Sequence, residues 1–109
     1  MAKKKPFIAS IKGITWEFHL QSNASYVRYN GKDSGAITYL GDKDVYFNQS
    51  QLTPGIVRHE VFHVFISSSG INSTTLSACN MEEICCEIYE SFGPEMDLVV
   101  DRILEHFLK

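Results

Sequence analysis

The sequence predicts an α+β fold, in which a small mixed or antiparallel sheet is followed by three helices. In the first half of the chain, short runs of β-branched and aromatic residues alternate with turn residues. From residue 53 onward, apolar residues instead recur at intervals of three and four. Strand spacing thus gives way to helical spacing once along the chain, as expected of strands followed by helices.

Length and composition limit the class of protein. The chain has 109 residues, 44% of them hydrophobic, which suits one modest core, so we expect a single domain over residues 1–109 with residues 1–6 as a flexible tail. The formal net charge of −3 gives no electrostatic reason to expect nucleic acid as a partner. Because no run resembles a signal peptide or a membrane span, we expect a cytoplasmic protein without a membrane partner.

The first clear strand covers residues 14–20. Trp16, Phe18 and Leu20 alternate there with polar residues, which predicts one buried face. His19 falls on the opposite face, so we interpret it as an exposed histidine and not as a metal ligand.

Three further strands are predicted before the helices begin. Residues 26–29 form a short strand ended by Asn30-Gly31, a strong turn dipeptide. Residues 36–40 and 45–48 then form two strands joined by a hairpin loop at residues 41–44.

A helix is predicted over residues 53–69. Thr53 is a suitable N-cap, Pro54 a suitable first helical residue and Gly70 a suitable stop. The helix contains the sequence His59-Glu60-Val61-Phe62-His63 in its middle.

This motif has the spacing of a metal site. Residues four apart on a helix lie on one face, so the imidazoles of His59 and His63 can bind one ion. Glu60 follows the first histidine, where its carboxylate can take a proton from a metal-activated water. The alternative is two partly buried surface histidines with no ligand.

The motif resembles that of the zincin metallopeptidases. The chain's size and order of elements are similar to those of the smallest gluzincins and of the short metallopeptidase-like proteins of phages and bacteria related to the ImmA/IrrE group. The resemblance covers roughly residues 36–92. It implies Zn²⁺ as the cofactor, and it implies that strand 36–40 or strand 45–48 binds a peptide along its free edge.

Two more helices complete the prediction. Residues 76–92 form an acidic helix that ends at Gly93-Pro94, and residues 94–108 form a last helix with an apolar stripe. His106 near its end suits the helix dipole. Of the three cysteines, Cys85 or Cys86 should pack as a small hydrophobic residue, and all three should be free thiols.

By the same resemblance, a glutamate of the acidic helix is the third metal ligand. Glu83, with Glu87 four residues later to orient a ligand histidine, fits the gluzincin pattern best. Glu82 is the rival, although Cys86 stands four residues after it. In a third reading Asn80 is an N-cap with Glu83 as its capping-box partner, and neither glutamate binds metal.

The sequence therefore predicts a zinc metallopeptidase with Glu60 as general base and His59, His63 and Glu83 as ligands, acting on a peptide or protein. The alternative is a catalytically silent zincin-like module with a binding or regulatory role, encoded by a phage. Tyr39, Tyr46 and Tyr89 are candidates for stabilising an oxyanion, and no motif selects among them.

Overall fold

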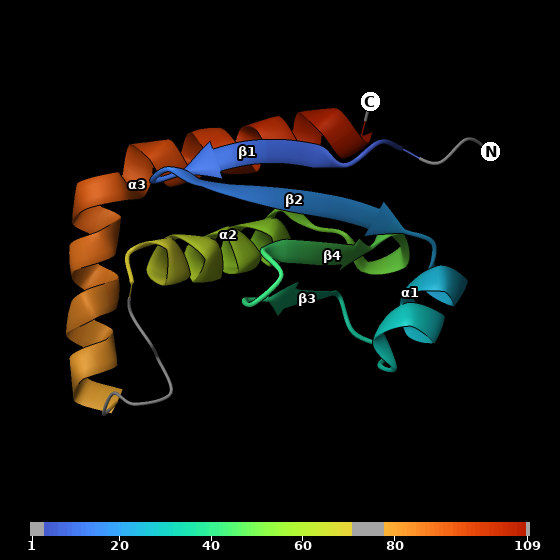
Figure 1. Ribbon diagram of the computed structural model, residues 1–109, viewed down its shortest axis with the longest axis horizontal. Helices are drawn as coiled ribbons and strands as arrows, with labels where there is room; N and C mark the ends of the chain where they lie inside the picture. Colours follow the sequence, from blue (N-terminus) through green and yellow to red (C-terminus); the bar gives the residue numbers. More distant parts are fainter. Residues whose placement is uncertain (1–3, 71–77, 109) are drawn as a thin grey trace.

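The computed structural model describes residues 4–70 and 78–108, and residues 1–3, 71–77 and 109 lie outside the description. Along the chain, all four strands come before the two long helices, and one short helix lies between the second and third strands (Figure 1). Their bounds are β1 Phe7–Ile11, β2 Ile14–Gln21, α1 Asn23–Asn30, β3 Ala36–Tyr39, β4 Asp44–Asn48, η1 Gln49–Gln51 (a 3₁₀ turn), α2 Pro54–Ser68 and α3 Ala78–Leu108.

The four strands form one mixed sheet in the order β1-β2-β4-β3. β2 pairs with β4 in parallel, whereas β1–β2 and β3–β4 are antiparallel pairs. The predicted α+β class and the predicted hairpin of β3 and β4 are confirmed. Within the described chain β4 is paired on both sides, and β3 is left as an edge.

The core lies between one face of this sheet and the helices α2 and α3. Trp16 and Phe18 of β2 are fully buried, as the alternation predicted, and Leu20 is half-buried. The Trp16 indole donates a buried 2.9 Å hydrogen bond to Oγ of Ser68 at the end of α2. The buried partners from the other elements are Ile11, Val45, Phe47, Val57, Val61, Val64, Phe65, Ile66, Ile88, Met96, Val100, Ile103 and Phe107.

The predicted strand at residues 26–29 is wrong, because these residues belong to helix α1. The side chain of Ser22 caps the helix by accepting a 3.3 Å hydrogen bond from the amide of Ser25. At the other end, Gly31 adopts φ of 73° and its amide donates to the carbonyl of Val27. Asn30-Gly31 does end an element, but as a helix C-cap and not as a hairpin turn.

The predicted break at Gly93-Pro94 is also wrong, since α3 is continuous from Ala78 to Leu108 with Pro94 inside it. Figure 1 shows the helix changing direction along its course, with its second part beside β1. A proline inside a helix removes one backbone hydrogen bond and favours such a bend. Ile88 before the proline and Val100 after it are both buried in the same core, so packing keeps both halves helical.

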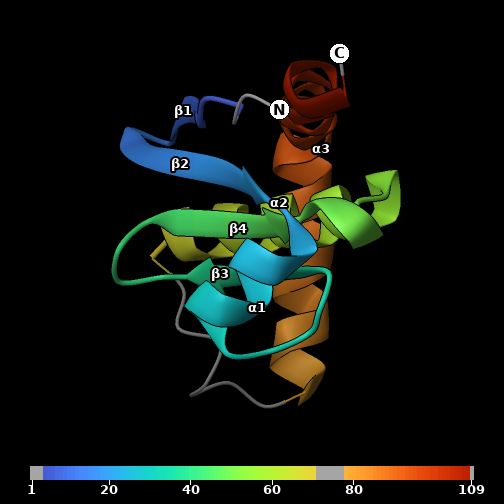
Figure 2. The ribbon, with the colours of Figure 1, turned by 90° about the vertical axis from the view of Figure 1, so that its right-hand side faces the viewer.

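The first turns of α3 extend past the edge strand β3 (Figures 1 and 2). Its last turns approach the start of the chain, where Nε2 of His106 lies 2.7 Å from the carbonyl oxygen of Lys5. Cys85 is half-buried against the core, as predicted for one of the pair, and Cys86 is exposed; both are free thiols. The side chain of Cys79 lies outside the described part.

Within residues 4–70 and 78–108, no helix combines the length and the apolar character that crossing a bilayer requires.

Candidate metal centre

Helix α2 carries the motif, and its ends form as the sequence predicts. Oγ1 of Thr53 accepts a 3.2 Å hydrogen bond from the amide of Ile56, and Pro54 is the first helical residue. After Ser68 the chain leaves the helix through Gly70, whose φ is 79°. The motif is therefore held in the interior of a capped helix.

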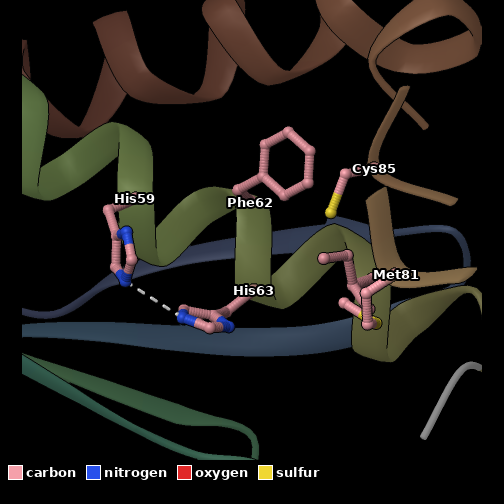
Figure 3. Close-up of a pocket in the computed structure, with 6 residues that line it drawn as sticks. His59, Phe62, His63, Met81 and Cys85 are labelled. Carbon is pink, nitrogen blue, oxygen red and sulfur yellow. Dashed lines mark hydrogen bonds between the residues drawn. The ribbon is translucent and has the colours of Figure 1, made fainter. Parts of the chain in front are cut away.

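The two histidines lie one turn apart on the exposed side of α2 and turn their Nε2 atoms toward each other (Figure 3). These nitrogens share a hydrogen bond of 3.1 Å, and the rings meet edge to face at 79°. Two imidazole nitrogens on one tetrahedral zinc, each at about 2.0–2.1 Å, lie about 3.3 Å from each other. The spacing in this structure fits a shared divalent ion.

Glu60 occupies the buried side of the same turn. Its side chain is almost fully covered, with 7% of the residue exposed. The hydroxyl of Thr38 on β3 donates a 2.8 Å hydrogen bond to Oε1, and Oε2 lies 3.7 Å from Nε2 of His59. One carboxylate oxygen is thus held by the sheet while the other faces the histidine pair.

Together, donor atoms of His59, Glu60 and His63 lie within 4.8 Å of one another, and no other group of three such residues is found in the described parts of the chain. The structure thus places a candidate metal-ligand group on α2.

Compared with known proteins, the chain matches no family model, no curated protein and no solved structure.

Glu83, the predicted third ligand, lies on the exposed surface of α3 and is not part of this group. Successive residues of a helix turn by about 100°, so Glu83 and Glu87 lie about 160° around α3 from Cys85, which faces α2. Glu82 lies only about 60° from Cys85 by the same count. Glu82 is nevertheless also exposed and outside the group, so the third ligand stays a prediction.

The capping interpretation of Asn80 does not fit the observed helix. α3 already includes Ala78, so Asn80 lies inside its first described turn. The predicted helix start at residue 76 lies outside the described residues.

A small cavity opens beside the histidine pair, between α2 and α3. Its volume is about 220 Å³. The lining residues come from both helices and are His59, Phe62, His63, Ile66, Met81 and Cys85. Apart from the two imidazoles, these side chains are hydrocarbons or contain sulfur as their only heteroatom. The candidate metal group therefore adjoins an apolar wall.

Thr38 is the site residue that sequence reasoning missed. It is paired with the buried Val45, so its side chain lies on the face of the sheet that α2 covers. Alternation along the strand could have placed it there, but only with the knowledge that β3 lies beside α2.

Residues 45–48 cannot supply the free strand edge, because β4 is enclosed by β2 and β3.

The tyrosine candidates do not join the group. The hydroxyl of Tyr39 donates to Asn30 at 2.8 Å, and that of Tyr46 donates to Tyr29 at 3.2 Å. Burial, followed by the hydrogen bond to Tyr29, raises the pKa of Tyr46 above its ordinary value. Tyr89 is 57% exposed on α3.

His19, expected to be exposed, is partly covered. Its ring stacks on Tyr46 with centroids 4.6 Å apart, and its Nε2 lies 3.3 Å from Oδ1 of Asp44. It lies outside the candidate metal group.

Proposed function

We propose that this protein is a zinc-dependent peptide hydrolase whose metal centre is built on α2. The observation that carries the proposal is the convergence of the two Nε2 atoms, 3.1 Å apart, next to a buried carboxylate. The same residues carry the resemblance to the zincin metallopeptidases, which pair two helical histidines with a glutamate between them.

His59 and His63 would hold the ion, which supplies a Lewis acid that polarises a carbonyl and lowers the pKa of water toward neutrality. Glu60 acts as the general base. It takes a proton from the attacking water and returns it to the leaving amine. Thr38 supports this role because its hydrogen bond fixes one carboxylate oxygen and leaves the other toward the histidines.

A hydrolytic zinc site has three protein ligands and one open position. We take Glu82 as the third ligand in place of Glu83, since it lies closer around α3 to the side that faces the histidines. A change of side-chain rotamer would have to carry the Glu82 carboxylate to the ion. Glu83 is the direct comparison, because it has the same chemistry on the opposite face.

The substrate would be an extended peptide lying along β3. This strand is the edge nearest to the motif, since Thr38 touches Glu60. Backbone amides and carbonyls of an edge strand can pair with an added strand, which gives affinity with little dependence on sequence.

One observation favours a second function, that of a zincin-like binding or regulatory module without turnover. In the described residues, the group around the two histidines contains no donor from α3. Without a third ligand the ion would be held weakly, and the scaffold would serve recognition and not chemistry.

The experiment that separates the two functions compares the wild type with Glu60→Gln. Both zinc-loaded proteins are incubated with a set of unstructured peptides, and products are read by mass spectrometry. Hydrolysis is expected for the wild type and should be lost in Glu60→Gln, which keeps its zinc. Zinc bound equally by both proteins, with no peptide cleaved by either, would favour the module.

A further inference from the structure

A second cavity lies on the face of the sheet that is turned away from the core. Alternation along β2 places Trp16 and Phe18 in the core, so His19 lies on the opposite face. Figure 2 shows α3 on one side of β1 and β2, with none of the described helices on their other side. The cavity there has a volume of about 230 Å³, and its lining residues are Lys4, Pro6, His19, Leu20, Gln21 and Tyr46.

The aromatic rings at this cavity stack on one another. The ring of Tyr46 contacts the imidazole of His19, with centroids 4.6 Å apart and planes 13° from parallel, and the ring of Tyr29 at 4.8 Å. Tyr46 is almost buried, with 9% of the residue exposed, whereas the side chain of His19 keeps 23% exposed. A further planar ring can therefore be added to the stack at His19, on the side of the imidazole away from Tyr46.

The polar groups around the cavity are mainly hydrogen-bond donors. Oε1 of Gln21 accepts a 3.1 Å hydrogen bond from Asn30, whose own oxygen accepts from the hydroxyl of Tyr39 at 2.8 Å. These bonds fix the orientation of the Gln21 amide and leave its NH₂ group as the donor that a ligand can use.

The charge at the cavity is positive. Lys4 contributes an ammonium group, and no acidic side chain is among the described residues that line the space. The Asp44 carboxylate is held against Nε2 of His19, at 3.3 Å, and is not part of the lining. A ligand with acceptor oxygens and a negative charge therefore suits this cavity, because such hydrogen bonds are stronger than those between neutral groups.

Size limits the ligand further. Pockets that hold whole drug-sized ligands enclose about 300–1,000 Å³. At about 230 Å³ this cavity is smaller, so it suits one ring with one charged group.

We propose that this cavity is a second ligand site, which binds a small aromatic carboxylate. The ring of the ligand stacks on His19, and its carboxylate accepts hydrogen bonds from the Gln21 amide and the Lys4 ammonium group. The site is independent of the proposed hydrolase function, since none of its residues belongs to the candidate metal group.

The test compares three ligands on isotope-labelled, zinc-loaded, full-length protein, with binding followed by nuclear magnetic resonance of the backbone amides. Benzoate has both features, benzamide keeps the ring without the charge, and cyclohexanecarboxylate keeps the charge without a flat ring. Benzoate should bind at least about tenfold more tightly than benzamide. It should bind about 2- to 10-fold more tightly than cyclohexanecarboxylate. The shifts should centre on the amides of His19 and Gln21.

Two glutamines supply a matched pair of variants. Gln21→Glu keeps an acceptor for Asn30 but replaces the NH₂ donor by a charged oxygen, so it should weaken benzoate binding at least about tenfold. Gln49→Glu makes the same change at an exposed residue of η1, outside the cavity, and should leave the affinity unchanged. In His19→Ala, the preference for benzoate over cyclohexanecarboxylate should disappear.

Equal affinities for benzoate and benzamide in the wild type would overturn the proposal. So would a benzoate affinity that is the same in Gln21→Glu and in the wild type. Shifts centred on His59 and His63 would overturn it as well, because they would place the carboxylate on the zinc. Each of these results would leave the proposed hydrolase function standing.

Discussion

The hydroxyl of Thr38 donates a 2.8 Å hydrogen bond to Oε1 of Glu60, and this bond joins the edge strand of the sheet to the motif helix. Glu60 is buried, so its carboxylate needs such a partner in place of water. The same contact places β3, one of the two edge strands of the described sheet, next to the candidate metal group. A single side chain thus links the buried carboxylate of Glu60 with the strand proposed to bind substrate.

Replacing Thr38 by valine keeps the shape of the side chain and removes the donor. The buried carboxylate then lacks one partner, so we expect the free energy of unfolding to fall by about 1–3 kcal/mol. Urea unfolding measures the change. Thr38→Ser retains the hydroxyl and should recover most of the loss, and equal stability of the valine variant and the wild type would contradict the role assigned to this bond.

The third ligand can be assigned from the zinc affinities of two glutamate variants. We expect Glu82→Gln to lose at least about tenfold in zinc affinity, because an amide is a much poorer ligand than a carboxylate. Glu83→Gln should retain wild-type affinity, since this residue lies on the far side of α3. Competition with a chromogenic chelator gives both constants, and the reverse order would restore Glu83 as the ligand.

Much of the fold could be predicted from residue patterns, and the failures have physical causes. Alternation of Trp16 and Phe18 identified β2, and the caps Thr53 and Pro54 identified α2, because each signal is local. Helix α1 was missed because the tyrosines at residues 26 and 29 favour strands, whereas the cap at Ser22 decides in favour of a helix.

The sequence predicts a helix end at Pro94, because proline cannot continue the hydrogen-bond ladder. In the structure the helix continues through Pro94, since apolar residues on both sides are buried in one core. Such burial is a property of the assembled fold that local spacing does not report.

For the candidate site, the motif was sufficient to bring His59, Glu60 and His63 together, because one helical turn fixes their relation. Thr38 and the cavity were beyond prediction, since both depend on which strand and which helix pack against α2. The choice between the two glutamates stays a prediction, since it needs the rotation of α3 about its own axis, which coarse spacing cannot supply.

The buried hydrogen bond from Trp16 to Ser68 provides a test of the core. Ser68→Ala leaves the indole N–H without this acceptor, so we expect a loss of about 1–3 kcal/mol in the free energy of unfolding. The change can be followed through the fluorescence of Trp16, the single tryptophan of the chain. The neighbouring Ser67→Ala is the control, and its free energy of unfolding should stay close to that of the wild type. A larger loss in Ser67→Ala than in Ser68→Ala would show that the hydrogen bond to Trp16 is not what stabilises the end of α2.

Tyr46 should contribute to the pH dependence of stability. Its pKa is raised in the folded protein, chiefly by burial, above the value near 10 of an unfolded chain. A raised pKa means that the full stability is present below about pH 10 and is lost as the pH rises above it, because the unfolded chain releases its proton first.

We therefore expect the urea midpoint to fall less steeply between about pH 9 and pH 11 in Tyr46→Phe than in the wild type. Tyr89→Phe is the control, since Tyr89 is exposed on α3 and is not among the groups that act on Tyr46. Identical slopes for the wild type and Tyr46→Phe would show that this buried hydroxyl does not govern alkaline stability.

The metal content of the purified protein tests the central claim most directly. Protein prepared without added metal is analysed for zinc by mass spectrometry, for the wild type and for His59→Ala, His63→Ala and Glu60→Gln. We expect about one zinc per chain in the wild type and in Glu60→Gln, and far less in either histidine variant. A wild type without bound metal, or a His63→Ala protein with undiminished zinc, would contradict the account.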